Sequence, residues 1–414
     1  MRIRKYYPFA FIYFFVNSLG LPFGLLYTMI LTPVFYVWIL LKGKREIIVK
    51  FLLVASPFIL NHLLNGVDTF QYFRSIALFF TVYVFCYAFY TLITTYNGIE
   101  EIFRKLLIFN FILTIIAVFF IFTPYRDLLW NKWFIEIGQL SVTDLPRLMM
   151  FTYEPSYYAT LLVPIVGFYL TKTILKQPEK NPVITLIMVL VPLLLSFSMG
   201  VIAGVIVAIG ILFLMNLSIL LTSKRLFYSF IILTTSFVLT ITFLFIFFPE
   251  NPFFVRIIAI VSGADASANG RTFQAFELAH IIAAKKSLWW GVGPGQLKII
   301  GDAIIKDYYR YRPGYGQVSI PSAFPETIAL FGYIGAGLRL FIELYLFFKT
   351  RVLNSYYRTF LFFYIFVYQF TGSFTTNIAE YVIWILAFTN IFPQFDKKRR
   401  NRGNLLEEQQ QLIT

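Results

Sequence analysis

Long runs of apolar residues, separated by short polar or charged stretches, make up most of the chain. A transmembrane helix needs roughly 20 predominantly apolar residues, and runs of about that length recur throughout. The pattern therefore predicts an all-α polytopic membrane protein with about 12 transmembrane helices. The predicted spans are residues 8–19, 21–41, 47–64, 75–96, 106–123, 157–174, 183–197, 200–221, 227–248, 324–348, 359–370 and 378–392.

Two of the apolar runs, residues 8–41 and 183–221, contain no charged residue and are too long for a single span. At about 1.5 Å per residue, each is longer than a hydrocarbon core of about 30 Å. Each run must therefore fold back on itself. The sequences Gly20-Leu21-Pro22 and Ser196-Phe197-Ser198-Met199-Gly200 combine helix-breaking and small residues, so we expect the two reversals there.

Composition and charge agree with a membrane protein. The hydrophobic fraction is 59% and the charged fraction only 13%, which is unlike a soluble domain. Most Lys and Arg residues fall in the connections on the side of the N-terminus, so the positive-inside rule predicts that both termini are cytoplasmic. This distribution accounts for the net charge of +15, and no nucleic acid partner is needed to explain it.

The domain organisation that follows is a single polytopic membrane domain over residues 1–396. Residues 397–414 form a basic and then polar cytoplasmic tail, which we expect to be disordered. The one cysteine, Cys86, lies within a predicted span and cannot form an internal disulfide. His62 and His280 lack carboxylates at a metal-ligand spacing, so we expect no metal and no cofactor.

Two long connections, residues 124–157 and 249–323, lie on the predicted extracytoplasmic side. Loops of this length are usually functional or disordered, and both are rich in aromatic residues, so we expect ordered loops that carry short helices. Residues 269–288 read as one helix with Asn269 near its N-terminal cap. The predicted apolar face of this helix comprises Phe273, Phe276, His280 and Ala283. A helix on the membrane surface and a helix packed on the bundle both fit this face.

Three glycines, Gly291, Gly293 and Gly295, follow Trp289 and Trp290 directly after this helix. The spacing is not a dinucleotide fingerprint, and no P-loop Lys follows. Backbone without side chains can approach a phosphate closely and offer N–H donors to it. A simple chain reversal explains the same glycines.

Three segments together resemble one family of membrane enzymes. "NGRTFQAFELAHIIAAKKSLWWGVGPGQL" (269–297) resembles the part of the bacterial O-antigen polymerase and O-antigen ligase superfamily in which Asn/Ser-Gly-Arg leads through a helix to Gly-x-Gly-x-Gly. "LPRLMMFTYEPSYYATLLVP" (145–164) resembles the family's Arg before a Glu-Pro-Ser. "PSAFPETIALFGYIGAGL" (321–338) resembles its helix with Gly-x-x-Gly after the large loop.

The resemblance implies a GT-C-like, metal-independent glycosyltransferase in the bacterial plasma membrane. Its substrate would be an undecaprenyl-pyrophosphate-linked oligosaccharide at the extracytoplasmic face, and its product an O-antigen, capsule or exopolysaccharide chain. A flippase and chain-length regulator proteins are the further partners that the family implies. Arg147 and Arg271 match the positions of the family's two pyrophosphate-binding arginines.

The chemistry of glycosyl transfer fits arginine at these positions. Negative charge develops on the pyrophosphate leaving group, and guanidinium groups bind phosphate oxygens in pairs without a proton transfer. Stabilising such developing charge in a dry site is usually a large catalytic contribution. The alternative for Arg147 and Arg271 is an interfacial side chain whose charged end reaches toward water.

The base that activates the acceptor hydroxyl is less well defined by the sequence. Glu154 is the first candidate because Glu-Pro-Ser places a carboxylate at a helix start near Arg147, although it could equally orient the arginine. Glu326 is the second candidate. Ligase-type relatives carry a histidine where this chain has Pro321-Ser322-Ala323, so the base stays unassigned and the ligase interpretation is weakened.

Two other groups of residues are candidates for substrate contacts or transport. In "KDYYRYRPGYG" (306–316), Tyr311 could stack on sugar rings, while Arg310 and Arg312 could hold phosphates or acidic sugars. An interfacial aromatic belt is the alternative there. Arg339 and Glu343 lie four residues apart in a predicted span and are expected to neutralise each other, with a transport relay as the alternative.

The sequence therefore predicts a polysaccharide polymerase. A ligase that transfers finished glycan is the alternative within the same class. A flippase or exporter of lipid-linked oligosaccharide is the alternative from another class, but the long extracytoplasmic loops with their arginines favour an enzyme.

Overall fold

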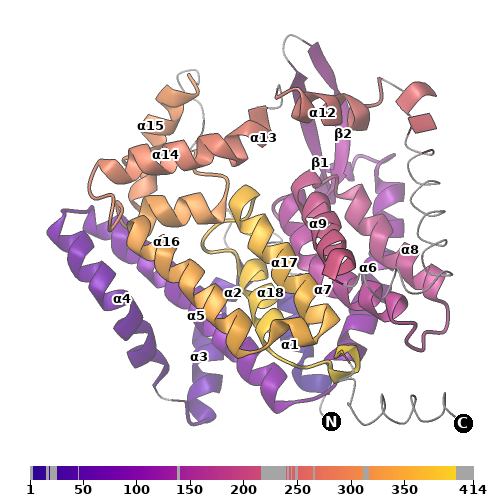
Figure 1. Ribbon diagram of the computed structural model, residues 1–414, viewed down its shortest axis with the longest axis horizontal. Helices are drawn as coiled ribbons and strands as arrows, with labels where there is room; N and C mark the ends of the chain where they lie inside the picture. The colour runs from indigo at the N-terminus through magenta and orange to yellow at the C-terminus, as the bar shows by residue number, and fades with distance from the viewer. Residues whose placement is uncertain are drawn as a thin grey trace, which may run out of the picture.

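The computed structural model describes residues 3–14, 18, 26–44, 46–137, 140–215, 239, 242–243, 245–247, 250–263, 266–310, 316 and 318–397. These residues form a helical bundle with a two-stranded sheet at one end (Figure 1). The helices of the bundle are α1 (Tyr7–Phe14), α2 (Tyr27–Ile30), α3 (Thr32–Leu41), α4 (Ile47–Leu64), α5 (Thr69–Thr95), α6 (Ile99–Phe120), α7 (Pro155–Ile174), α8 (Pro182–Leu195), α9 (Met199–Met215), α16 (Ala323–Lys349), α17 (Tyr356–Thr371) and α18 (Ile378–Phe388).

The predicted spans coincide well with these helices. A helix lies at every predicted span except residues 227–248, most of which fall outside the described residues. The helix break predicted at residues 196–200 is confirmed, because α8 ends at Leu195 and α9 begins at Met199. The predicted reversal at residues 20–22 and the tail after Lys397 lie outside the described part of the chain.

Among the residues that the structure describes, four helices, α4, α5, α6 and α16, are long and apolar enough to cross a membrane. Their outward surfaces carry large apolar side chains, such as Leu53 and Phe341, which are 69% and 65% exposed. Contiguous exposed apolar surface of this kind is typical of contact with lipid. The protein is therefore a largely α-helical, membrane-embedded protein.

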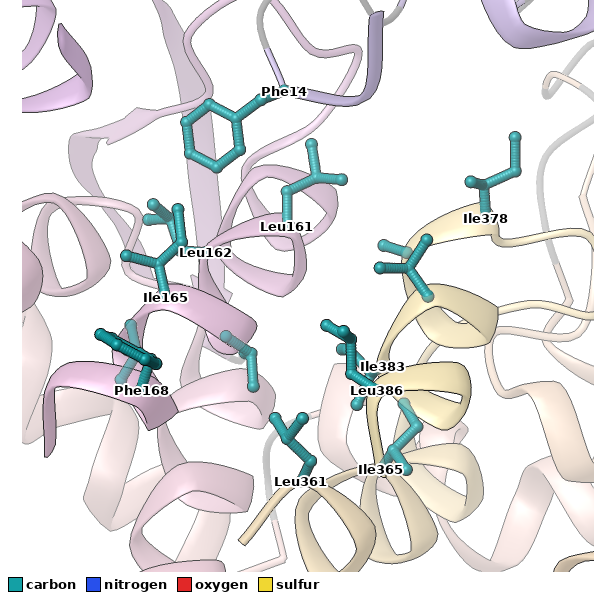
Figure 2. Packing of buried hydrophobic residues seen from close by; sticks show 14 of the residues in the cluster. Phe14, Leu161, Leu162, Ile165, Phe168, Leu361, Ile365, Ile378, Ile383 and Leu386 are labelled. Carbon is teal, nitrogen blue, oxygen red and sulfur yellow. The ribbon is translucent and has the colours of Figure 1, made fainter. Parts of the chain in front are cut away.

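Helix α7 lies at the centre of the bundle and is buried on nearly all sides. Figure 2 shows Leu161 and Ile165 of α7 facing the same interior space as Ile365 of α17 and Leu386 of α18. The close packing of α7 and α17 depends on Gly167, since a Cβ there would lie 2.6 Å from the ring of Phe360. This core holds the ends of α7 and α17 in fixed positions.

We call the end of the bundle that carries this sheet the hairpin end. Its elements are β1 (Trp130–Ile137), β2 (Leu140–Leu148), α12 (Pro252–Val261), α13 (Ala266–Arg271), α14 (Phe273–Ala284) and α15 (Gly301–Tyr308) (Figure 1). The first long loop was expected to carry short helices, but it forms an antiparallel β1–β2 hairpin after a single 3₁₀ turn. Aromatic and β-branched residues such as Trp133, Ile135 and Val142 favour strands, which explains the difference.

The helix predicted over residues 269–288 is in fact two helices. The backbone breaks at Thr272 (φ −102°, ψ −111°), between α13 and α14. Asn269 lies inside α13 and donates its side-chain amide to the Gly263 carbonyl, so it is not a helix cap.

The buried face of α14 also differs from the predicted face. Phe273 is 88% exposed, and the side chains packed against α16 are those of Ala275, Leu278, Ala279 and Ile282. Because alanines let two helices approach closely, the small residues decide which face of α14 is buried. Of the two placements left open by the sequence, the structure has α14 packed on the bundle.

Candidate functional site

Arg147 lies near the end of β2, where its backbone is paired with Asn131 of β1. Its Nε donates a hydrogen bond of 3.2 Å to the Ser196 carbonyl oxygen in the α8–α9 turn. The side chain is partly buried. The hairpin therefore serves to hold this arginine against the turn between two bundle helices.

Glu154 is the residue immediately before α7, and its extended backbone (φ −155°, ψ 152°) directs the chain into the helix. Pro155 occupies the first helical position, where its fixed φ is favourable and its missing N–H costs nothing. The Glu154 carboxylate accepts a hydrogen bond of 2.5 Å from the Ser156 hydroxyl. A carboxylate at this place is also stabilised by the positive end of the helix dipole.

Arg271 is the last residue of α13. Its carbonyl oxygen accepts a hydrogen bond of 2.9 Å from the Ser322 hydroxyl, just before α16. The backbone N–H of Ala323, the residue after Ser322, donates a hydrogen bond of 3.0 Å to the Gly372 carbonyl. Within the described ranges, no carboxylate forms an ion pair with the Arg271 guanidinium. A partly buried cation without a carboxylate is suited to an anionic ligand.

Tyr368, near the end of α17, connects these three residues in space. Its buried ring stacks on Tyr364, with ring centroids 5.5 Å apart. Gly372 makes room for this ring, because a Cβ at that position would lie 2.5 Å from it.

The Tyr368 hydroxyl lies within electrostatic reach of both Arg271 and Glu154. A Cβ on Gly200, at the start of α9, would lie 3.6 Å from the same ring. The α8–α9 turn that binds Arg147 is therefore next to Tyr368. Arg147, Glu154 and Arg271, which are far apart in the sequence, belong to one region at the hairpin end.

A second tyrosine, Tyr153, contributes a polar group to this region. Its ring packs on Tyr157, with centroids 4.9 Å apart, and on Phe374. Burial raises the pKa of the Tyr153 hydroxyl well above its usual value, and the neighbouring Glu154 carboxylate raises it further. That hydroxyl is buried with no hydrogen-bond partner among the described residues. It is a neutral donor that a bound oxyanion could satisfy.

The three predicted glycines occupy a different place. Gly291, Gly293 and Gly295 all have positive φ. A Cβ on Gly291 would overlap the backbone at Leu330 of α16, and one on Gly295 would overlap Gln71 of α5. These positions need glycine because three backbones meet there.

Three consecutive N–H groups of this loop, those of residues 291–293, already have acceptors in the protein. Val292 donates to the Ala329 carbonyl and Gly293 to the Leu330 carbonyl, both at 2.9 Å. Gly291 donates to the Ser287 carbonyl at 2.7 Å. The N–H groups of Gly291 and Gly293 thus satisfy carbonyls of the protein, which favours the chain-reversal alternative at these two positions.

The loop compensates for a break in α16. Gly332 has non-helical angles (φ 66°, ψ −170°), which frees backbone groups on both sides of it. Tyr333 and Ile334 donate to the carbonyls of Leu288 and Trp289 at 3.0 and 3.1 Å. His62, fully buried at the end of α4, is hydrogen-bonded to the Trp290 carbonyl at 2.7 Å and to the Tyr72 hydroxyl at 3.0 Å.

Glu326 lies in the first turn of α16, and its carboxylate accepts a hydrogen bond of 2.7 Å from the Thr375 backbone N–H. It therefore holds the turn between α17 and α18. Since Ser322 lies one helical turn earlier and bonds Arg271, Glu326 is near the site, in a supporting position.

The predicted glycan-contact segment is only partly described. Tyr311 and Arg312 lie outside the described residues, and Arg310 is exposed just after α15. The preceding residue, Tyr309, places its hydroxyl against Gly270 beside Arg271. The structure thus brings the end of α15 next to α13.

Helix α15 is held on α14 by polar contacts. The Tyr308 hydroxyl donates to Glu277 at 2.6 Å, and this carboxylate raises the pKa of Tyr308 to about 12. Asp302 accepts from the Val318 N–H at 2.9 Å and pairs with Lys306 at 2.8 Å, and the Lys306 ammonium lowers the pKa of that carboxyl.

The predicted pair of Arg339 and Glu343 is present, with 3.1 Å between Nε and Oε1, but it is part of a larger network. Arg339 also contacts Glu380 of α18, Gln369 of α17 and Thr327 of its own helix. Gln369 in turn donates to Glu343 at 2.8 Å. A buried arginine with this many partners joins three helices.

Sequence reasoning missed Tyr368, Tyr153 and Glu380. Tyr368 lies in an apolar run and is one of 27 tyrosines, so nothing in its local pattern distinguishes it. The only usable signal was Gly372, four residues later, which leaves space for the ring.

A comparison of the chain with protein-family models finds none that matches, and a comparison with curated proteins finds no match either.

Proposed function

We propose that this protein is a polysaccharide polymerase of the bacterial plasma membrane. It transfers a growing undecaprenyl-pyrophosphate-linked glycan onto a new lipid-linked repeat unit at the extracytoplasmic face. In this proposal the chain has twelve spans of the GT-C type, both termini are cytoplasmic, and the hairpin end is extracytoplasmic. The O-antigen polymerase resemblance of three segments gives the reaction class.

The observation that carries the proposal is the gathering of Arg147, Glu154 and Arg271 around the end of α17. Arg147 and Arg271 bring two cations to this region, next to the carboxylate of Glu154. A pyrophosphate is the anion that two guanidinium groups bind best, because each can contact two oxygens. The Tyr153 hydroxyl, which has no hydrogen-bond partner in the described part of the chain, supplies a further donor.

The proposed reaction forms one bond and breaks one bond. The acceptor hydroxyl oxygen bonds to the anomeric carbon of the growing chain, and the bond from that carbon to the pyrophosphate oxygen breaks. The electron pair of the broken bond stays on undecaprenyl pyrophosphate, where Arg271 and Arg147 stabilise it. The acceptor proton passes to a base, for which Glu154 is the best-placed carboxylate.

The test uses the native host with the gene deleted and then restored with unmodified protein or with Arg271→Ala. We expect long surface chains only with unmodified protein, and single displayed repeat units in the deleted and Arg271→Ala strains. Arg104→Ala, which removes an exposed arginine of α6 that is not part of the group around Tyr368, is the matched control.

Other outcomes identify other functions. Long chains that accumulate on the lipid carrier but never reach their acceptor would indicate a ligase. Repeat units trapped inside the cell would indicate an exporter. Normal polymer from a folded Arg271→Ala variant would refute the assignment of the site.

A further inference from the structure

Two lysines from different parts of the chain meet at one tyrosine, at the end of the bundle away from the hairpin. Lys5 ends a short 3₁₀ turn before α1, Lys42 directly follows α3, and Tyr96 directly follows α5. Helix α6 leads from this end to the hairpin, and the N-terminus in Figure 1 marks the same end. We call these three residues the two-lysine site.

The Tyr96 hydroxyl is a shared acceptor in this site. Both lysine Nζ atoms donate hydrogen bonds of 2.8 Å to its oxygen, and a phenolic oxygen can accept two hydrogen bonds and still donate its own proton. The two ammonium groups also lie 4.3 and 5.3 Å from the centre of the Tyr96 ring, within the range of cation–π attraction. The hydrogen bonds from Lys42 and Lys5 lower the pKa of the Tyr96 hydroxyl, as an excess of positive charge should.

The positive charge of the two lysines is not balanced by a carboxylate. Because both hydrogen bonds end on one oxygen, the two Nζ atoms are at most twice the bond length apart, and like charges this close repel each other. Over the described ranges neither lysine forms an ion pair, whereas Lys50, Lys105 and Lys172 at the same end each pair with a glutamate. A bound anion would relieve the repulsion.

The backbone around the site is anchored in the core. Tyr6, the residue after Lys5, is 2% exposed, and its hydroxyl donates to the Tyr96 carbonyl oxygen. The Lys42 N–H donates at 3.0 Å to the carbonyl of Ile39, whose side chain is fully buried. These anchored backbones keep the two exposed lysine side chains within reach of one ligand.

An apolar surface adjoins the site on α3. Val34, Val37 and Leu41 are 61%, 53% and 82% exposed, and their spacing places them on one side of the helix. Exposed apolar side chains on a membrane-embedded protein are typical of contact with lipid. Lys42 follows Leu41 directly, where the apolar helix ends, so its ammonium group can reach the level of the lipid headgroups.

This combination selects a phosphate that is carried by a lipid. Phosphate oxygens accept charge-assisted hydrogen bonds from ammonium groups, and basic sites between membrane helices bind the headgroups of anionic lipids. A soluble phosphate would contact the two lysines and leave the apolar surface of α3 unused. An anionic phospholipid uses both parts, because its acyl chains begin next to its phosphate.

We propose that Lys5, Lys42 and Tyr96 bind the phosphate group of an anionic phospholipid in the leaflet away from the hairpin end. The two ammonium groups contact phosphate oxygens, and the Tyr96 hydroxyl donates its proton to the same phosphate. The acyl chains lie against α3. The inference does not depend on the proposed enzymatic activity, and in the topology proposed above this leaflet is the cytoplasmic one.

The first test compares two lipids on the unmodified protein. Native mass spectrometry of the full-length protein in a neutral detergent measures the dissociation constant of the first lipid molecule bound. The probes are phosphatidylglycerol and phosphatidylcholine with the same acyl chains, so that only the headgroup differs. We expect phosphatidylglycerol to bind about tenfold more tightly. Equal affinity for the two lipids would overturn the proposal.

Substitutions then locate the site. Lys5→Gln and Lys42→Gln should each weaken phosphatidylglycerol binding about fivefold, and the double variant about thirtyfold. Tyr96→Phe should weaken it about fivefold without changing the net charge. Lys50→Gln, which removes an exposed lysine that pairs with Glu46 at the same end, is the control and should change the affinity less than about twofold. A loss in Lys50→Gln as large as in Lys42→Gln, or no loss in the double variant, would overturn the proposal.

A competition experiment separates the lipid from a soluble phosphate. Glycerol 3-phosphate, added at the concentration of the lipid, should not displace phosphatidylglycerol. Displacement would overturn the proposal, since the acyl chains would then contribute nothing to binding. None of these measurements uses a glycan donor, so a failure here leaves the polymerase proposal standing, and a failure of polymerisation leaves the lipid site standing.

Discussion

The hydroxyl of Ser322 donates a hydrogen bond of 2.9 Å to the carbonyl oxygen of Arg271, and so ties the end of α13 to the start of α16. The adjacent N–H of Ala323 bonds the Gly372 carbonyl, beside the Tyr368 ring. Through these contacts the backbone of Arg271 is fixed relative to α16 and α17. An arginine on a short helix in a long loop thereby gains a defined position.

Removing this contact should loosen Arg271 without unfolding the protein. In Ser322→Ala we expect kcat/KM of glycan polymerisation to fall about fivefold, because one hydrogen bond contributes about 1 kcal/mol. The unfolding midpoint in detergent should change little. Ser56→Ala, which removes an exposed hydroxyl from α4, is the control. An unchanged kcat/KM in Ser322→Ala would show that this contact does not position Arg271.

The break in α16 gives a prediction for stability. Gly332→Ala should destabilise the protein by about 1–3 kcal/mol, because alanine is strained at φ 66° and its Cβ would overlap the backbone at Trp289. Gly337→Ala, on the same helix with open space around it, should be neutral or stabilising by up to about 1 kcal/mol. Thermal unfolding of the two variants in the same detergent measures the difference. Equal midpoints would mean that Gly332 does not require glycine.

The network around Arg339 predicts a large loss of stability from one substitution and a partial recovery from two. Arg339→Met leaves Glu343 and Glu380 buried without their cation, which should cost about 3–5 kcal/mol. Adding Glu343→Met should restore part of that loss, since one uncompensated carboxylate is then gone. Comparison of the unfolding midpoints of the single and double variants tests both expectations. A folded Arg339→Met protein of normal stability that has lost only activity would favour a relay role instead.

The attachment of α15 should depend on pH through Asp302. Lys306 and the Val318 N–H hold the pKa of the Asp302 carboxyl below its usual value of about 3.9. A lowered pKa means that the stabilisation is complete above that usual value and is lost as pH falls through the lower, folded-state pKa. Exchange protection of the Val318 amide should therefore be constant from pH 7 to 5 and fall only below about pH 4. In Asp302→Asn this fall in Val318 protection at low pH should be absent. In the unmodified protein, a loss of protection already near about pH 6 would contradict the prediction.

Much of the bundle could be predicted from the sequence, because apolar length is a strong signal in a membrane protein. The bounds of α4 at Ile47 and Leu64 and the α8–α9 turn agree with the prediction. The break at Gly332 could not be predicted, since it lies in an uninterrupted apolar run. Its backbone groups are satisfied by residues 288–293, and only the folded structure reveals that pairing.

The candidate site could also be predicted only in part. Arg147, Glu154 and Arg271 were predicted from motifs, and the structure brings them to one region. The glycines after Trp290 were assigned to phosphate because a positive-φ loop can serve a ligand or a neighbouring backbone equally well. The sequence does not reveal that the backbones of Leu330 and Gln71 lie against this loop, and their position decides between the two uses. Tyr368 was missed because its importance comes from what surrounds it.

The most direct test of the central claim is polymerisation by purified protein in lipid vesicles, supplied only with undecaprenyl-pyrophosphate-linked repeat units. We predict glycans of increasing length, with one undecaprenyl pyrophosphate released for each new linkage. Folded Arg271→Ala protein should produce neither. Failure of the unmodified protein to elongate any lipid-linked repeat unit from its native host, or normal elongation by Arg271→Ala, would contradict the account.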